Sequence, residues 1–136
     1  MFFRCGNFTS IDLSNFDTSN IIRMGCMFHS CNNLADVNLK SFDTSSIDQM
    51  NSLFENCKNL KSIDLSNFDT SNVTDMEEMF AFCENLTSID LSSSFNTKNV
   101  TKMKSMFYVC KHLKSIDLSN FDTSNVTDME EMFAFC

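Results

Sequence analysis

The sequence predicts a repeat protein of mixed α/β class, in which about five units of 26 residues stack as a solenoid. Two observations support this prediction: residues 60–83 recur as residues 113–136, and single residue types recur with one period along the chain. Cysteines that occupy one position of the repeat are 26, 26, 26, 27 and 26 residues apart, at Cys5, Cys31, Cys57, Cys83, Cys110 and Cys136. A fixed period of this length is typical of units that stack and share one core.

The repeat boundaries follow from the period. We expect a single array, residues 1–136, with repeats at 5–30, 31–56, 57–82, 83–109 and 110–136, and the one extra residue falls within 92–94. The chain opens with MFFRC and closes with MFAFC, the same phase of the repeat, which indicates part of a longer array. Neither end carries a polar capping repeat. The ends are therefore expected to be uncapped, to leave Phe2, Phe8 and Phe133 partly exposed, and to fray or associate end to end.

Each repeat begins with a predicted strand. In the third repeat, Ile63 and Leu65 alternate with Ser62, Asp64 and Ser66, which is the period of a strand with one buried face. Stacked copies of this strand would form a parallel sheet on one face of the solenoid.

The second half of each repeat predicts a short helix. Met76, Met79, Phe80 and Cys83 fall at i, i+3, i+4 and i+7, the apolar face of about two helical turns. Thr74 precedes this face and Glu77 follows three residues later, as in a capping box. The expected unit is strand, turn, short helix, turn.

Composition excludes several function classes. A net charge of −8 argues against nucleic-acid binding, which depends on a basic surface. No apolar run reaches 18 residues, so we expect no membrane insertion by this segment. The two histidines, His29 and His112, lie at different positions of the repeat, and no phosphate loop or nucleophile motif occurs. The sequence therefore does not predict an enzyme.

The pattern L-x-x-I-x-L-x-x-F resembles the leucine-rich repeat, and SIDLSNFDTSNVTDMxxMFxxC resembles the BspA-like leucine-rich repeats of the mycoplasma-lipoprotein type. This resemblance covers essentially the whole chain. It implies a right-handed leucine-rich-repeat solenoid in a cell-surface or secreted protein, with a role in adhesion or in binding host proteins. It names no ligand and implies no catalytic residue.

The exposed strand face is the candidate binding surface. Stacking aligns three polar columns: Ser10, Asp36, Ser62, Ser88 and Ser115; Asp12, Asn38, Asp64, Asp90 and Asp117; and Ser14, Lys40, Ser66, Ser92 and Ser119. Like charges placed opposite one another destabilise a sheet slightly. One interpretation is a solvated face that opposes aggregation, and another is a surface for a protein partner. A metal site is disfavoured because Ca²⁺ needs six to eight oxygen ligands.

The cysteines are predicted to be core thiols, with no disulfide, zinc site or other cofactor. Close pairs such as C-x₂-C are absent. Cys26 is the exception, because it shares a position with Ser52, Glu78, Ser105 and Glu131, which the helical pattern places outside. We therefore expect Cys26 to be the one reactive thiol.

The leading hypothesis from the sequence is a protein–protein interaction module. Two alternatives remain open. One is that the segment is a structural spacer in a surface stalk, which the recurrence of residues 60–83 as 113–136 favours. The other is an intracellular scaffold, which free thiols favour.

Overall fold

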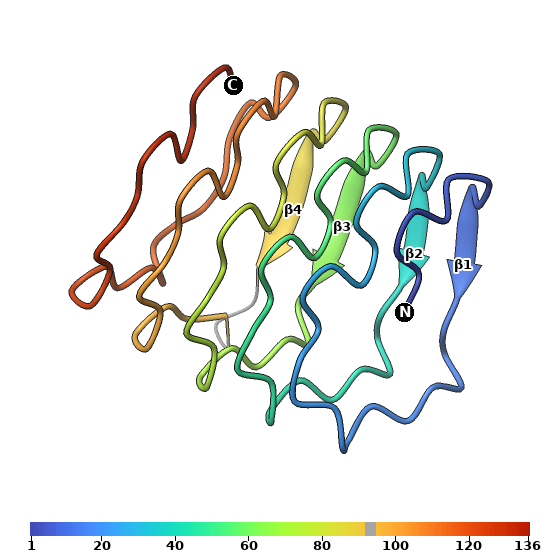
Figure 1. Cartoon of the computed structure of the whole chain (residues 1–136), viewed down its shortest axis with the longest axis horizontal. Coiled ribbons are helices and arrows are strands. Elements are labelled where there is room, and N and C mark those ends of the chain that lie inside the picture. The colour runs from blue at the N-terminus through green and yellow to red at the C-terminus, as the bar shows by residue number, and fades with distance from the viewer. Residues whose placement is uncertain (92–94) are drawn as a thin grey trace.

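The computed structural model describes residues 1–91 and 95–136 as a row of stacked coils (Figure 1). The first four repeats each contribute one strand: β1 is Ser10–Asp12, β2 is Asp36–Asn38, β3 is Ser62–Leu65 and β4 is Ser88–Leu91. The chain advances by one coil per repeat, so residues one period apart lie side by side. The position of the extra residue, 92–94, lies outside the described residues.

The strands pair in parallel, but not in one continuous sheet. β1 pairs with β2, which places Asp12 beside Asn38, and β3 pairs with β4, which places Asp64 beside Asp90. The described residues thus form two two-stranded sheets, β1–β2 and β3–β4. β2 and β3 are neighbours in the row of coils, yet they belong to different sheets (Figure 1).

The predicted α/β leucine-rich-repeat solenoid with short helices is wrong. The described residues contain no helix, and residues 77–82 fold as consecutive turns. Glu78 has a φ of 55° and Phe82 has a φ of 60°. A residue at positive φ cannot continue a right-handed helix. Each repeat carries this pair of left-handed positions, at Cys26 and Ser30, Ser52 and Asn56, Glu78 and Phe82, Ser105 and Val109, and Glu131 and Phe135.

The backbone hydrogen bonds explain why turns replace the helix. The N–H groups of Met76, Glu78, Phe80 and Phe82 donate to carbonyls of the next coil, at 2.7 to 3.0 Å. The N–H groups of Met79, Ala81 and Cys83 donate within the coil, to carbonyls three residues back, at 3.1 to 3.3 Å. A helix would direct every N–H four residues back and leave the neighbouring coil without partners. Stacking therefore replaces helical hydrogen bonds.

The predicted capping box is wrong for the same reason. The Thr74 hydroxyl donates to the Asp48 carbonyl of the preceding coil at 3.2 Å, instead of capping its own segment. The Glu77 N–H donates to the Asp75 carboxylate at 3.0 Å. Both residues serve the turns and the contact between coils.

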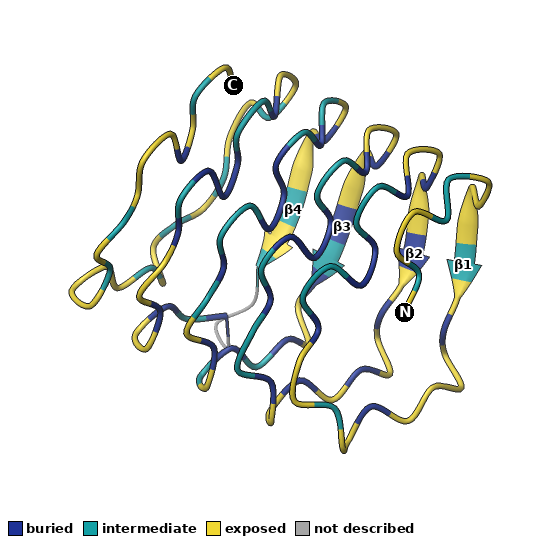
Figure 2. Ribbon diagram, viewed as in Figure 1, coloured by how far each residue is buried: buried dark blue, intermediate teal, exposed yellow. Residues whose placement is uncertain are grey.

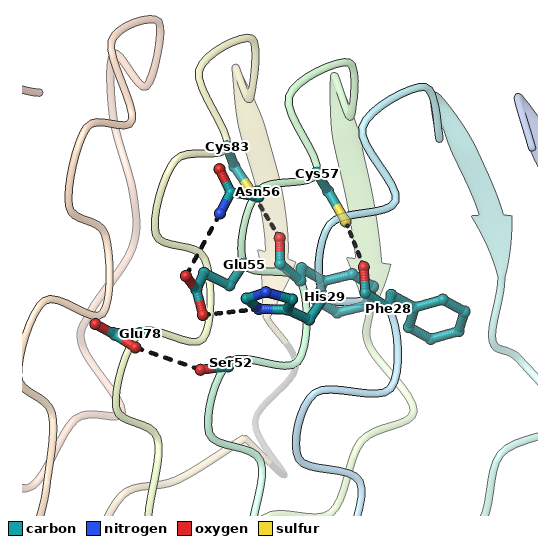
Figure 3. Close-up of polar contacts among 9 residues, drawn as sticks. Phe28, His29, Ser52, Glu55, Asn56, Cys57, Glu78 and Cys83 are labelled. Atoms are coloured by element: carbon teal, nitrogen blue, oxygen red, sulfur yellow. Dashed lines mark hydrogen bonds and ion pairs between the residues drawn. The ribbon is translucent and has the colours of Figure 1, made fainter. Parts of the chain in front are cut away.

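The core lies inside the coils, where buried residues recur at the same place in each repeat (Figure 2). Phe28, Phe54, Phe80 and Phe107 are fully buried and stack ring on ring, with centroids 5.3 to 5.7 Å apart. The Cys57 thiol donates to the Phe28 carbonyl at 3.2 Å (Figure 3). Buried methionines fill the space beside these rings, at Met24, Met50, Met76 and Met103. The sequence placed the phenylalanine, methionine and cysteine columns in the core, and in the inner coils that placement is confirmed.

A column of buried threonines adds polar contacts between coils. Thr18, Thr44, Thr70 and Thr97 are at most 2% exposed. The Thr70 hydroxyl donates to the Asn96 carbonyl at 2.6 Å and accepts the Asn96 N–H at 2.8 Å. One side chain thus satisfies both peptide groups of a residue in the next coil.

The two outermost coils expose apolar side chains, as the sequence predicts. Phe8 is 45% exposed and Phe133 is 42% exposed, while Phe2 is half-buried. Met129 and Phe135 are exposed as well, at 48% and 71%.

Candidate functional site on the strand face

A hollow of about 350 Å³ lies on the strand face, between β2 and β3. Eight residues line it: Asp36, Val37, Asn38, Leu39, Lys40, Ser62, Ile63 and Asp64. The set includes five residues of the predicted polar columns: Asp36, Asn38, Lys40, Ser62 and Asp64. These eight residues define the strand-face hollow.

The hollow lies where the sheet is interrupted. Paired parallel strands lie about 4.8 Å apart and leave no such space between them. Beyond the ends of β2 and β3, the Asn67 amide reaches into the preceding coil and donates to the carbonyls of Leu39 at 3.1 Å and Phe42 at 3.0 Å. In the second repeat the same position holds Ser41, whose hydroxyl donates to the Leu13 carbonyl at 3.1 Å. The strands of these two coils, β1 and β2, do pair. The longer side chain, Asn67, thus occurs where the neighbouring strands β2 and β3 do not pair.

The carboxylate of Asp64 forms part of the turn that follows β3. It accepts the Ser66 N–H at 3.0 Å, and Asn38 accepts the Lys40 N–H at 3.2 Å in the same way. The hydrogen bonds from Ser66, aided by Lys40, lower the pKa of Asp64, so this carboxyl is ionised at neutral pH. Asp12 and Asp117 have their pKa lowered by the corresponding bonds from Ser14 and Ser119.

One ion pair crosses the hollow. Lys40 Nζ lies 3.8 Å from Asp64 Oδ2, and the two side chains are 75% and 44% exposed. An exposed pair at this distance contributes about 0–1 kcal/mol, since solvent screens it and both side chains lose conformational freedom. The Asp64 carboxylate therefore remains available to another cation.

The other predicted face residues lie outside the hollow. Ser10 and Asp12 are on β1, Ser88 and Asp90 are on β4, and Ser66 follows β3. Ser115 and Asp117 are exposed in the fifth repeat, whose described residues form no strand. Ser92 lies outside the described residues. The structure thus gathers one part of the predicted columns into a site.

Cys26 does not lie on an exposed column. It is half-buried with a φ of 57°, and at the same position Ser52 and Ser105 are 7% and 6% exposed. The helical interpretation put this position outside, whereas the left-handed turn directs it partly inward. Among the other cysteines, Cys136 is exposed and Cys5 is half-buried.

The inner cysteines are free and poorly reactive. Burial raises the pKa of Cys57 and Cys83, and it raises the pKa of Cys110 to about 12. Because the thiolate is the reactive form, these thiols behave as small apolar groups.

A histidine–carboxylate pair lies on the turn side of the coils, away from the strands (Figure 3). His29 Nδ1 is 2.8 Å from Glu55 Oε2, and both side chains are largely buried. The ring of His29 also stacks on Phe3, with centroids 4.9 Å apart. His29 and Glu55 are 26 residues apart, one period of the repeat, and this spacing is the sequence signal that places the two in neighbouring coils.

The second acidic group of this region, Glu78, does not extend the pair into a catalytic set. Ser52 Oγ donates to Glu78 at 3.4 Å, so its hydroxyl is directed to that carboxylate. Burial, followed by the nearby charges of Glu55 and Glu77, raises the pKa of Glu78. The described residues contain no group of three or more His, Cys, Asp or Glu side chains that could hold a metal ion.

The family model described as "Mycoplasma protein of unknown function, DUF285" matches residues 1–93 and 52–136. The chain belongs to the DUF285 family. No curated protein matches this DUF285 chain. No solved structure matches it. Within residues 1–91 and 95–136 there is no helix with the length and apolar character needed to span a membrane.

Proposed function

We propose that this DUF285 chain is a protein-interaction module and that the strand-face hollow receives part of the partner protein. The observation that supports this proposal most is the convergence of Asn38, Lys40, Ser62 and Asp64 on one concave site. Concave sites with a few convergent polar groups are the usual form of binding sites in proteins.

The interrupted sheet strengthens the proposal. β2 and β3 each pair on one side only, with β1 and β4 respectively. The facing edges therefore offer backbone N–H and C=O groups to a partner. A partner strand or loop would gain affinity from the main chain and specificity from the side chains around it.

The proposed setting is a cell-surface or secreted protein that takes part in adhesion or in binding host proteins. It rests on the likeness of SIDLSNFDTSNVTDM to BspA-like surface repeats. Labelling intact source cells with a membrane-impermeant amine reagent tests this setting. Modification of the chain in intact cells is expected, and labelling only after lysis would move the chain inside and favour a scaffold.

Binding at the hollow is tested with matched lysine substitutions. A photoreactive residue at position 62 first identifies the partner by crosslinking, and the affinity of that purified partner is then measured. Ser62→Lys should weaken binding at least about tenfold, because a bulky cation then projects into the hollow. Ser10→Lys is the control, since Ser10 occupies the same column on β1 but does not line the hollow. Equal affinities of both variants and the original chain would refute the proposal.

A second candidate function is a spacer in a surface stalk. The stacked column of phenylalanine rings, which runs from Phe2 to Phe133 without interruption, favours a stiff rod. In a spacer, replacing residues 57–82 by residues 31–56 would leave the activity of the parent protein unchanged. In an interaction module, the same exchange would remove the partner-binding site.

A further inference from the structure

We infer that the strand-face hollow binds a cationic side chain, arginine above all, that an extended segment of the partner protein presents. This inference rests on the proposed function, because it names the chemistry of the partner at the same site. It goes further in assigning the ligand to one kind of side chain.

The charges of the lining residues favour a cation. Asp36 and Asp64 supply two carboxylates, whereas Lys40 supplies the single ammonium group. The side chain of Lys40 is 75% exposed and its pair with Asp64 spans 3.8 Å, so a stronger cation displaces it at little cost. The net charge of −8 attracts a basic partner over a longer range.

The number and placement of acceptors favour a guanidinium group. Arginine carries five N–H donors in a planar fork and binds carboxylates through two parallel hydrogen bonds. Asp36 projects from β2 and Asp64 from β3, so acceptors lie on both sides of the hollow. The hydroxyl of Ser62 and the unpaired strand edges add neutral acceptors. A lysine ammonium has three donors and would leave more of these acceptors unused.

The hollow is large enough to receive one side chain of an extended segment. About 350 Å³ is near the lower limit of ligand pockets, which range from about 300 to 1,000 Å³. A segment that lies along the open edges of β2 and β3 can pair through its main chain while one side chain enters between them. Two carboxylates supply too few oxygens for Ca²⁺, which takes six to eight.

The test is an NMR titration of the full 136-residue chain labelled with ¹⁵N. The probe is the acetylated and amidated peptide Gly-Ser-Arg-Ser-Gly, and the control replaces arginine by citrulline, which keeps the shape but carries no charge. We expect the arginine peptide to shift the amide signals of residues 36–40 and 62–64 saturably. The citrulline peptide should bind about tenfold more weakly, as expected when charge-assisted hydrogen bonds become neutral ones.

Three variants locate the effect. Asp64→Asn keeps the turn, because Asn38 makes the same turn in the preceding coil, and should weaken arginine-peptide binding. Lys40→Gln removes the competing cation and should strengthen it. Asp12→Asn is the matched control, since Asp12 makes the same turn outside the hollow, and it should leave binding unchanged.

Two results would overturn the inference. One is equal affinity for the arginine and citrulline peptides, including the case in which neither binds. The other is saturable binding of CaCl₂ at the same amides at lower concentrations than the peptide. After either result the proposed function still stands if Ser62→Lys weakens binding of the purified partner protein. By contrast, if Ser62→Lys leaves the affinity for the purified partner protein unchanged, the proposed function itself is refuted.

Discussion

At the residue scale, the buried threonines show how single side chains connect the coils. Thr70 satisfies both the N–H and the carbonyl of Asn96 through one hydroxyl. Thr70→Val keeps the volume but removes the partner of two part-buried peptide groups, the N–H and C=O of Asn96, which should lower the free energy of unfolding by about 2 kcal/mol. Urea denaturation measures the change.

Thr74→Val is the matched control for this prediction. The Thr74 hydroxyl is exposed and donates to the Asp48 carbonyl, which also accepts the Thr74 N–H at 2.9 Å. Its loss should cost less than about 1 kcal/mol. Equal losses for the two variants would show that the hydroxyl of Thr70 has no special role.

The cysteines make a second prediction at this scale. Cys5, Cys26 and Cys136 are at least partly accessible, whereas Cys57, Cys83 and Cys110 are fully buried and have raised pKa values. Native labelling with a thiol reagent at pH 8 should modify the first three and spare the last three, as read by mass spectrometry. Modification of Cys83 at the rate of Cys26 in the folded chain would contradict the burial of Cys83 in the core.

At the scale of the element, the turns that replace the helix make opposite predictions from a helix. Glycine is about 1 kcal/mol less favourable than alanine inside a helix, but it is favoured at positive φ. Because Glu78 has a φ of 55°, Glu78→Gly should be about 1 kcal/mol more stable than Glu78→Ala by thermal or urea denaturation. Comparing glycine with alanine cancels the loss of the charge.

The neighbouring position provides the control. Glu77 has no left-handed backbone, so Glu77→Ala should be more stable than Glu77→Gly. If alanine were better at both positions, residues 76–83 would be helical and the turn assignment would be wrong.

The sequence predicts the repeat, the buried columns and the position of the strands, because all three depend on a periodic pattern of apolar residues. It does not predict the turns. Met76, Met79, Phe80 and Cys83 have helical spacing, yet the same four side chains are buried by turns with left-handed residues at Glu78 and Phe82. Propensity rules disfavour glutamate and phenylalanine in that conformation, and only the hydrogen bonds between coils compensate for its cost.

The candidate site was predicted in part for a similar reason. The columns that contain Asp64 and Lys40 follow from the period, but the hollow follows from a break between two strands. One sequence difference between the two repeats at that break is Asn67, where the second repeat has Ser41. Its significance depends on the reach of the Asn67 amide to the carbonyls of the preceding coil.

At the scale of the whole molecule, the exposed ends predict association of the 136-residue chain. Met129, Phe133 and Phe135 are exposed on the last coil, and Phe3, Phe8 and Ile22 on the first. Arg23, Gln49, Asp75, Lys102 and Asp128 occupy one column of bridges between coils, so a second copy stacked head to tail would place Arg23 beside Asp128. Concentration-dependent sedimentation should reveal this association.

Charge reversal tests the orientation of the stack. Arg23→Glu should weaken the association, because it would place two negative charges together at the junction. Lys114→Glu makes the same charge change at an exposed position away from that column and should have a smaller effect. A monomer at all concentrations would contradict the expected end-to-end contact.

The central claim is that the sheet is open between β2 and β3, and hydrogen exchange tests it most directly. Amides in the β1–β2 and β3–β4 ladders should be protected, while those on the facing edges of β2 and β3, within 36–40 and 62–64, should exchange faster. Asn67→Ser should allow the two strands to approach and should slow exchange at these edges, as serine does between β1 and β2. Uniform protection across all four strands, unchanged by Asn67→Ser, would show a continuous sheet and remove the hollow on which the proposed function rests.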